Sequence, residues 1–224
     1  QGVRRPFSST IIFTSVSRTM SSYRGRFAPS PTGALHAGSL VAAMASFLDA
    51  RAHDGVWLVR IEDIDPPRDI PGAGEHIIRT LARLGLASDE PVLWQHDRHE
   101  AYQAALDRLI AQGRVYGCAC SRKEVALRAA ELGLPAGVSP GTMTRAMRFL
   151  TTSGTTTFTD RLCGDFTQDV EHEVGDFVLK RADGLWAYQL AAIVDDIHQG
   201  VTDVVRGADL LDNTPRQIQL IEAL

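Results

Sequence analysis

The pattern of apolar and polar positions in the first half of the chain predicts alternating strands and helices. Val56–Ile61 is a short, mostly apolar run bounded by turn residues, which is typical of a buried parallel strand. Arg24–Ala28 is predicted as a second short strand. Elsewhere apolar residues recur every three or four positions, which predicts three amphipathic helices. Their expected inner faces carry Leu40, Val41, Met44, Phe47, Leu48 and Arg51, then Ile77, Ile78, Leu81 and Leu84, then Tyr102, Leu106, Leu109 and Ile110.

Turn and capping residues set the boundaries of these elements. Pro66 and Pro67 interrupt the chain after the apolar run. Asp97 and Glu100 resemble a capping box, so the third helix is expected to begin there, and Gly113 is expected to end it.

The second half of the chain is predicted to contain more strands and loops than the first. Ser121 and Glu124 predict a capped short helix, and a Gly/Pro/Ser/Thr-rich loop follows to about Thr144. Strands are predicted at 146–150, 155–159 and 201–205, and Asp183-Gly184 predicts a hairpin turn. Asn213-Thr214-Pro215 is expected to cap a last helix that has Ile218 and Ile221 on one face.

This order of elements predicts an α/β fold: a Rossmann-like, parallel-sheet nucleotide-binding domain interrupted by an inserted α+β subdomain. We expect an extension over 1–22, the first half of the domain over 23–114, the inserted subdomain over 115–184, and the second half over 185–224.

Composition narrows the class of protein. The chain has 224 residues, of which 44% are hydrophobic, a net charge of −4 and three cysteines, so we expect a globular protein of a reducing compartment without a membrane partner. A nucleic-acid partner would have to meet a local basic surface.

The composition of the N-terminal residues and the positions of the two chain ends lead to further predictions. Residues 1–19 contain Arg4, Arg5 and Arg18, many Ser and Thr, and no acid, which is the composition of an organelle transit peptide. We favour instead a disordered extension before Met20, and hence a cytoplasmic protein. Because the chain begins without Met and stops at Leu224 inside a helical pattern, we expect it to be incomplete at both ends.

The segment RFAPSPTGALHAGS, Arg26 to Ser39, is the strongest chemical signal. A strand, a Pro-rich turn and a helix start place free N–H groups and the positive end of a helix dipole beside an incoming anion. Gly38 would let phosphates approach the backbone closely, and His36 adds a polar contact. A chance Pro/Gly loop before a helix is the alternative.

Two further segments carry candidate ligand-binding charges. RIEDIDPPR, Arg60 to Arg68, places Glu62 at the carboxyl end of the buried strand, where it would need a cation such as an ammonium group; the alternative is a set of solvated charges paired with Arg60 and Arg68. In VVRGADLLDNTPRQI, Arg206 could bind a carboxylate through two parallel hydrogen bonds. Tyr188 could offer its hydroxyl to the same ligand, or pack as a strand aromatic into the core.

Five motifs occur in order: RFAPSPTG, HAGS, RIEDIDPPR, GLWAYQLA and VRGADLL. Together they resemble class I aminoacyl-tRNA synthetases of the glutamate- and glutamine-specific branch, over roughly 23–224. GSLVAA and RIEDIDPPR fit the shortened paralogues of the glutamyl-tRNA synthetase catalytic domain better than the ordinary enzyme.

The resemblance implies a monomeric, ATP-dependent ligase that activates L-glutamate as glutamyl-adenylate and transfers it to the queuosine base at the wobble position of tRNA(Asp). It implies that His36, Gly38 and Ser39 hold ATP, which enters with magnesium. The implied glutamate pocket consists of Arg26, Phe27, Ala28, Pro29, Ser30, Glu62, Tyr188 and Arg206.

Other readings stay open. They are a fragment of an ordinary glutamyl-tRNA synthetase, a non-catalytic paralogue that binds ATP or glutamate, and a nucleotidylyltransferase with a similar His/Gly motif. The motifs RIEDIDPPR and VRGADL argue against the nucleotidylyltransferase. The resemblance places the Lys-rich loop that closes over ATP beyond Leu224.

A zinc site is a further feature of the resembling family, built from Cys-x-Cys followed by a Tyr and a Cys. Cys118 and Cys120 are present, but Ser139 and Met143 stand where the later pair is expected. Structural zinc takes four ligands, so this motif indicates free cysteines and a degenerate site without zinc.

Overall fold

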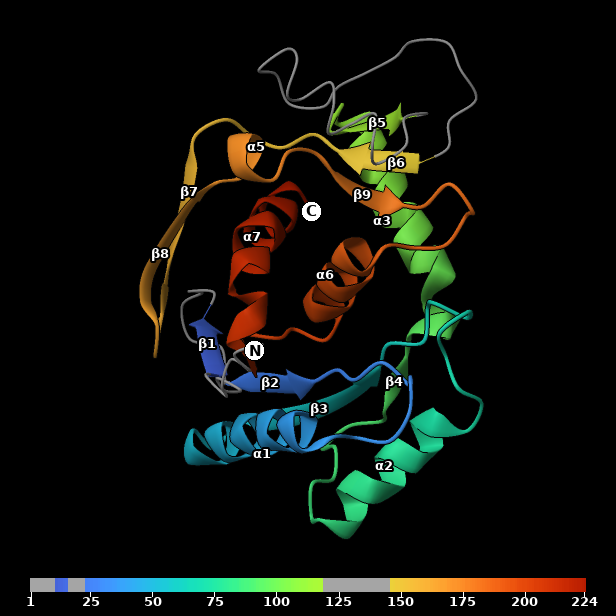
Figure 1. Ribbon diagram of the computed structural model, residues 1–224, viewed down its shortest axis with the longest axis vertical. Coiled ribbons are helices and arrows are strands. Elements are labelled where there is room, and N and C mark those ends of the chain that lie inside the picture. Colours follow the sequence, from blue (N-terminus) through green and yellow to red (C-terminus); the bar gives the residue numbers. More distant parts are fainter. Residues whose placement is uncertain (1–10, 16–22, 119–145) are drawn as a thin grey trace, which may run out of the picture.

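The computed structural model describes residues 11–15, 23–118 and 146–224. In these residues a seven-stranded sheet has the strand order β4-β3-β2-β10-β1-β7-β8 (Figure 1). Strands β4, β3, β2 and β10 run parallel, whereas β1 is antiparallel to both of its neighbours and β7–β8 is a hairpin. The strands are β1 (Ile11–Ser15), β2 (Arg24–Phe27), β3 (Val56–Ile61), β4 (Leu93–Trp94), β7 (Thr155–Asp160), β8 (Gly164–Asp169) and β10 (Asp203–Gly207).

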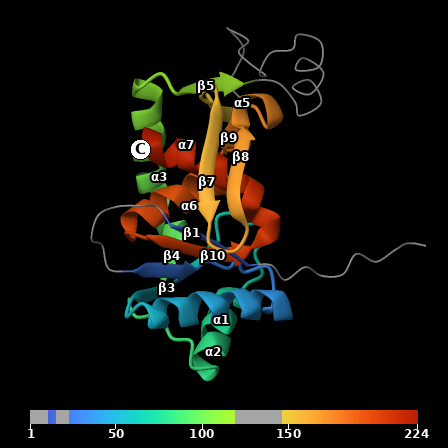
Figure 2. The ribbon, with the colours of Figure 1, turned by 90° about the vertical axis from the view of Figure 1, so that its left-hand side faces the viewer.

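Helices cover both faces of the parallel part of this sheet. Figures 1 and 2 show α1 and α2 on one side of β2 and β3, and α6 and α7 on the other. A smaller antiparallel sheet, of order β5-β6-β9, lies beyond α6. The remaining elements are α1 (Ala37–Ala52), α2 (Ala73–Arg83), η1 (Gln95–Arg98), α3 (His99–Ala111), β5 (Val115–Cys118), β6 (Ala146–Phe149), α5 (Val170–Glu173), β9 (Phe177–Lys180), α6 (Tyr188–His198), η2 (Ala208–Asn213) and α7 (Thr214–Ala223).

The strand–helix–strand order predicted an α/β fold with a parallel nucleotide-binding sheet, and the structure confirms it. β3 has the predicted bounds and pairs in parallel with β2 and β4. The predicted strands β2, β6, β7 and β10 and the turn at Asp183-Gly184 are also present. The predicted helix at Ser121 lies outside the described residues.

Two apolar cores hold the layers together. One lies between α1, α2 and the sheet and includes Trp57, Ile61, Ile77 and Leu81. The other is shared by α3, β6, β9, α6 and α7, with Tyr102, Phe149, Leu179, Leu190 and Leu220 at its centre. Residues from the expected insertion therefore pack into one core with α6 and α7.

The buried face of α1 differs from the predicted one. Val41, Met44 and Leu48 are exposed, and the helix instead buries Ala43, Ser46 and Ala50. Small side chains let the helix axis approach the sheet closely, and the Ser46 hydroxyl accepts a 2.9 Å hydrogen bond from Trp57 Nε1. The apolar period located the helix but assigned it the wrong face, because packing distance decided the orientation.

Other local predictions were wrong where tertiary packing overrode local signals. The 3-10 turn η1 precedes α3, so Arg98 replaces Asp97 as the N-cap, and Ile110 is exposed. Tyr188 begins α6 and is not in a strand. Asn213 makes no side-chain cap to α7.

Four of the described strands, β1, β4, β5 and β8, were not predicted. Ile11–Ser15, inside the expected disordered extension, forms β1 between β10 and β7. β8 closes a hairpin with β7 and pairs Thr155 with Asp169 at its open end.

The substitution Gly74→Ala tests how closely α2 packs on β4. A Cβ at this position would lie 2.6 Å from the Trp94 ring. Helix propensity alone would make Gly74→Ala stabilising by up to about 1 kcal/mol, whereas overpacking costs about 1–3 kcal/mol. We expect a net loss in the free energy of unfolding in urea. Glu75→Ala, on the exposed side of the same turn, is the matched control; a gain in stability for Gly74→Ala would contradict the packing.

Candidate active site

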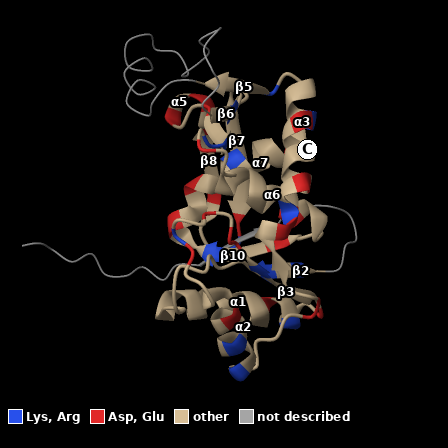
Figure 3. Cartoon of the chain, turned by 90° about the vertical axis from the view of Figure 1, so that its right-hand side faces the viewer, with Lys and Arg blue, Asp and Glu red and all other residues tan. Residues whose placement is uncertain are grey.

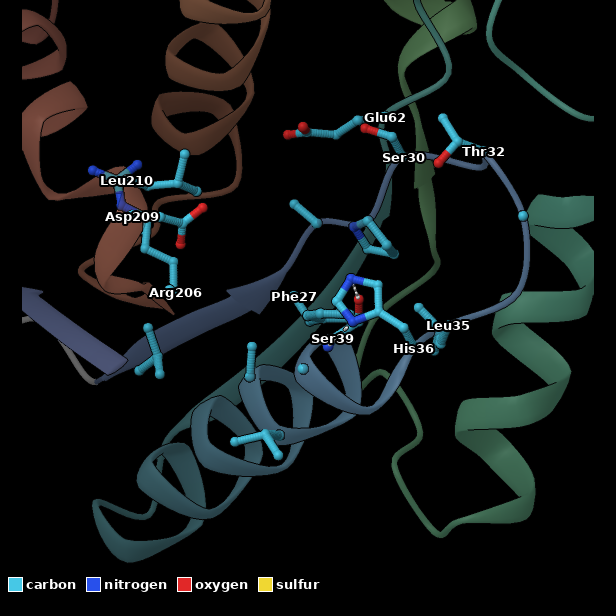
Figure 4. A pocket seen from close by; sticks show the side chains of 18 of the residues that line it. Phe27, Ser30, Thr32, Leu35, His36, Ser39, Glu62, Arg206, Asp209 and Leu210 are labelled. Atoms are coloured by element: carbon cyan, nitrogen blue, oxygen red, sulfur yellow. Dashed lines mark hydrogen bonds between the residues drawn. The ribbon is translucent and has the colours of Figure 1, made fainter. Parts of the chain in front are cut away.

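A cavity of about 640 Å³ lies where the carboxyl ends of β2, β3 and β10 meet the N-terminus of α1 (Figure 4). Open parallel sheets bind ligands at this edge. The cavity brings together every residue that the sequence predicted for ATP and glutamate: Arg26, Phe27, Ala28, Pro29, Ser30, His36, Gly38, Ser39, Glu62, Tyr188 and Arg206. The roles of these residues stay predictions.

The start of α1 has the form of an anion site. His36 is the N-cap, and its Nδ1 accepts a 3.2 Å hydrogen bond from the Ser39 backbone N–H. A Cβ on Gly38 would lie 3.1 Å from His36 Cε1, so glycine lets the imidazole lie across the first turn. The first turn carries no acidic residue, whose carboxylate would neutralise the positive end of the dipole and repel an anionic ligand. In Figure 4 the His36 and Ser39 side chains lie together at the cavity end of α1.

A buried ionic network lies beneath the cavity. Asp196 on α6 accepts hydrogen bonds from Arg26 Nε at 3.1 Å and from Arg60 at 2.7 Å. Burial alone would raise the pKa of Asp196, but the two guanidinium groups hold it at about 2. Arg60 is fully buried and also donates to Glu62 Oε1 at 3.1 Å. The network fixes Glu62 from below at the end of β3.

Glu62 lies in the wall of the cavity. Burial raises the pKa of its carboxyl group, and Arg60 and Arg26 oppose the rise. Figure 4 shows its side chain extending from the end of β3 into the cavity. The alternative prediction for Glu62 was a solvated charge paired with Arg60 and Arg68. The pairing with Arg60 is present, but Glu62 is buried and therefore not solvated.

Arg206 has a different environment. It is buried, and its terminal nitrogens donate to Gln217 at 2.7 Å and to the Thr214 hydroxyl at 2.6 Å, both neutral groups. Its Nε has no hydrogen-bond partner, and among the described residues no carboxylate forms an ion pair with it. Burial lowers the pKa of Arg206. A buried cation with neutral partners favours an anionic ligand.

Sequence reasoning missed other residues of this site. Thr32, Asp209 and Leu210 line the cavity, and Figure 4 places Asp209 and Leu210 beside Arg206. Asp196 was missed as well, although two consecutive acids inside an apolar helix signal buried partners. Asp195, its neighbour, accepts hydrogen bonds from Gln95, Arg98 and Tyr102.

A second cavity of about 460 Å³ adjoins the first. The two share Ser30, Thr32, Glu62, Arg68 and Tyr188 in their walls. Asp65, Trp186 and Arg181 line the second cavity alone. The two cavities therefore meet at Glu62 and Tyr188.

The cysteine motif is only partly described. Cys118 ends β5 as a buried free thiol, and Cys120, Ser139 and Met143 lie outside the described residues. The expectation of a zinc-free motif stays a prediction. None of the helices in the described ranges has the length and apolar character that crossing a membrane requires.

The fold and the cavity define an α/β protein with a cavity beside a helix N-terminus, at the edge where its parallel strands end. Comparison with known proteins specifies the family. Residues 22–135 and 139–224 match the family described as tRNA synthetases class I (E and Q), catalytic domain, and the chain belongs to this family. Its members are ligases that use ATP with magnesium.

Similar proteins support this assignment. A glutamyl-Q tRNA(Asp) synthetase from Dechloromonas aromatica is 57% identical over 214 residues, covering 91% of this chain and 71% of that protein. One from Chromobacterium violaceum is 55% identical, covering 90% and 70%. A solved glutamate tRNA ligase from Elizabethkingia meningosepticum, in complex with its amino acid, superposes with a TM-score of 0.77 at 26% identity, and this chain spans about half of its length (47%).

The network under the cavity predicts a large cost for Asp196→Asn. Removing one partner of a buried ion pair costs about 3–5 kcal/mol, because Arg26 and Arg60 would lose their buried counter-charge. We expect this loss in the free energy of unfolding at pH 7, with Asp97→Asn, an exposed change, near parent stability.

The same network fixes the pH dependence. A carboxyl group with a depressed pKa stabilises the fold above its unfolded pKa of about 3.9, and this contribution disappears as the pH falls through the folded value of about 2. The stability difference between parent and Asp196→Asn should therefore shrink between about pH 4 and pH 2 in urea titrations. A difference that stays constant over this range would contradict the assignment.

Proposed function

We propose that this protein activates L-glutamate with ATP and transfers the glutamyl group to the queuosine base of tRNA(Asp). The observation that carries the proposal is the pairing of opposite charges in one cavity: Glu62 at the end of β3 and Arg206 at the end of β10. The 57% identity to a protein named glutamyl-Q tRNA(Asp) synthetase, against 26% to a glutamate tRNA ligase, supports the queuosine acceptor over tRNA(Glu).

Glutamate fits the cavity through its charges. Glu62 would accept the ammonium group, and Arg206 would bind the side-chain carboxylate with help from the Tyr188 hydroxyl. Arg26 is already paired to Asp196 through Nε and a terminal nitrogen, so it adds positive potential and a rigid floor. This division leaves the α-carboxylate free to face the nucleotide.

ATP fits beside it, at the start of α1. The free N–H groups of the first turn, His36 and Ser39 would hold the phosphates, and Gly38 would permit their close approach. Magnesium is bound in such sites largely by substrate phosphates and would enter with the nucleotide, where it neutralises charge.

The reaction needs positioning and electrostatics more than a protein nucleophile. An oxygen of the glutamate α-carboxylate attacks the α-phosphorus of ATP, the bond from that phosphorus to the bridging oxygen breaks, and pyrophosphate leaves. A hydroxyl of the queuosine base then attacks the acyl carbon, and AMP leaves with the electrons of the broken acyl–oxygen bond. The second cavity supplies the approach for this acceptor, because it shares Glu62 and Tyr188 with the first.

Substrate choice tests the first half-reaction. Glutamine would leave Arg206 without a charged partner, which we expect to cost about 2 kcal/mol or more, a factor of about 30 in kcat/KM. Pyrophosphate exchange should therefore be at least that much faster with glutamate, and Arg206→Gln should reduce the preference. Equal exchange with both amino acids would overturn this assignment of the pocket.

Acceptor choice tests the second half-reaction. We expect pyrophosphate exchange without any tRNA, and transfer of labelled glutamate to tRNA(Asp) that contains queuosine. The same tRNA transcribed without the modification is the control and should accept none. Stable charging of unmodified tRNA(Glu) would favour an ordinary glutamyl-tRNA synthetase instead.

A further inference from the structure

Helix α2 has a basic face that neither the cavity nor the cores use. His76, Arg79 and Arg83 are exposed and follow the spacing i, i+3, i+7, so they form one stripe along the helix. The opposite face buries Gly74, Ile77 and Leu81 against the sheet. Figure 3 shows the arginines of α2 as blue bands at the end of the molecule.

The two arginines of this stripe are free to bind an external anion. The two acids that follow α2 in the sequence are paired with other cations: Asp89 with Arg51 at 2.7 Å and Glu90 with Arg24 at 2.8 Å. Within the ranges that the structure describes, neither Arg79 nor Arg83 forms an ion pair, although Glu75 lies one turn before Arg79.

The stripe begins close to the cavity. The chain leaves the cavity wall at Glu62, passes Arg68, which lines both cavities, and enters α2 at Ala73. The loop is fastened to the cavity by a 2.9 Å hydrogen bond from the Ile70 N–H to the Pro31 carbonyl. Figure 4 shows α2 beside the loop that carries Ser30, Thr32 and Leu35. The helix then extends for about 16 Å, at about 1.5 Å per residue.

We propose that this basic stripe of His76, Arg79 and Arg83 binds the phosphodiester backbone of the tRNA whose modified base enters the cavity. The proposal rests on the proposed function. The chain has a net charge of −4, so it does not attract RNA as a whole and needs a local row of cations beside the cavity. Arg68, which precedes α2 in the sequence, lines the cavity and is paired with Asp65 at 3.4 Å.

The test compares tRNA binding by Arg79→Gln/Arg83→Gln with that by the parent protein over a range of salt concentrations. We expect the Kd for queuosine-containing tRNA(Asp) to rise about tenfold or more. The slope of log K against log salt should fall in magnitude by about 1.4–1.8, because each of the two lost phosphate contacts removes about 0.7–0.9. Arg108→Gln, equally a surface change but on α3, is the matched control and should keep the parent Kd and slope.

Pyrophosphate exchange separates this proposal from the proposed function. The double variant should exchange as fast as the parent, because the stripe lies outside the cavity lining. An unchanged Kd and slope, a loss of exchange together with binding, or preferential binding of phosphatidylserine vesicles would each overturn the stripe as a tRNA surface. Absence of exchange in the parent would overturn glutamate activation alone, since the comparison of tRNA affinities would still measure the stripe.

Discussion

The burial of Asp196 between two guanidinium groups is the constraint on which the rest of the site depends. An isolated carboxylate in this position would be neutralised or exposed, and isolated arginines would be equally unfavourable. Together they form a network that joins β2, β3 and α6 at the floor of the cavity. Because Arg60 also bonds Glu62, the orientation of the ligand-facing carboxylate follows from the same network.

Asp195 extends this arrangement in the other direction. Its carboxylate accepts hydrogen bonds from Gln95, Arg98 and Tyr102 in η1 and α3. Asp196 accepts hydrogen bonds from the arginines of β2 and β3. Two adjacent residues of α6 thus fix the parallel sheet and the helical layer to one another. Arg206 is excluded from both groups and keeps neutral partners, which leaves its charge available to a ligand. Asp195 and Asp196 pair with other arginines, whereas Arg206 has no carboxylate partner among the described residues. Arg206 is therefore the arginine best suited to recognise the carboxylate of a ligand.

Local patterns predicted the parts of the fold that depend on local interactions. The apolar run at Val56–Ile61 and the strand–turn–helix at Arg26–Ser39 were predicted correctly, because periodicity and capping depend on residues that are close together in the sequence. The face of α1 could not be found this way, since it depends on how closely Ala43 and Ser46 approach the sheet.

In the site, too, the residues in local motifs were predicted and the residues that depend on tertiary contacts were not. Residues in recognisable motifs, such as Glu62 and Arg206, were predicted and lie in one cavity, although their roles rest on tests still to be made. Asp196 was missed because its partners, Arg26 and Arg60, lie far away in the sequence. β1 was missed because a Ser/Thr/Arg-rich composition around Ile11–Ser15 suggested an unfolded tail.

The pairing of β10 with β2 has a consequence for how this protein folds. The register places Asp203 opposite Gly25, so the two strands that carry Arg206 and Arg26 meet across almost the whole chain. Closing so long a loop is entropically costly and slow relative to forming local hairpins and helices. During synthesis, β2, β3 and α1 emerge well before their partner strand. The ligand cavity is therefore completed only after β10 has left the ribosome and paired with β2.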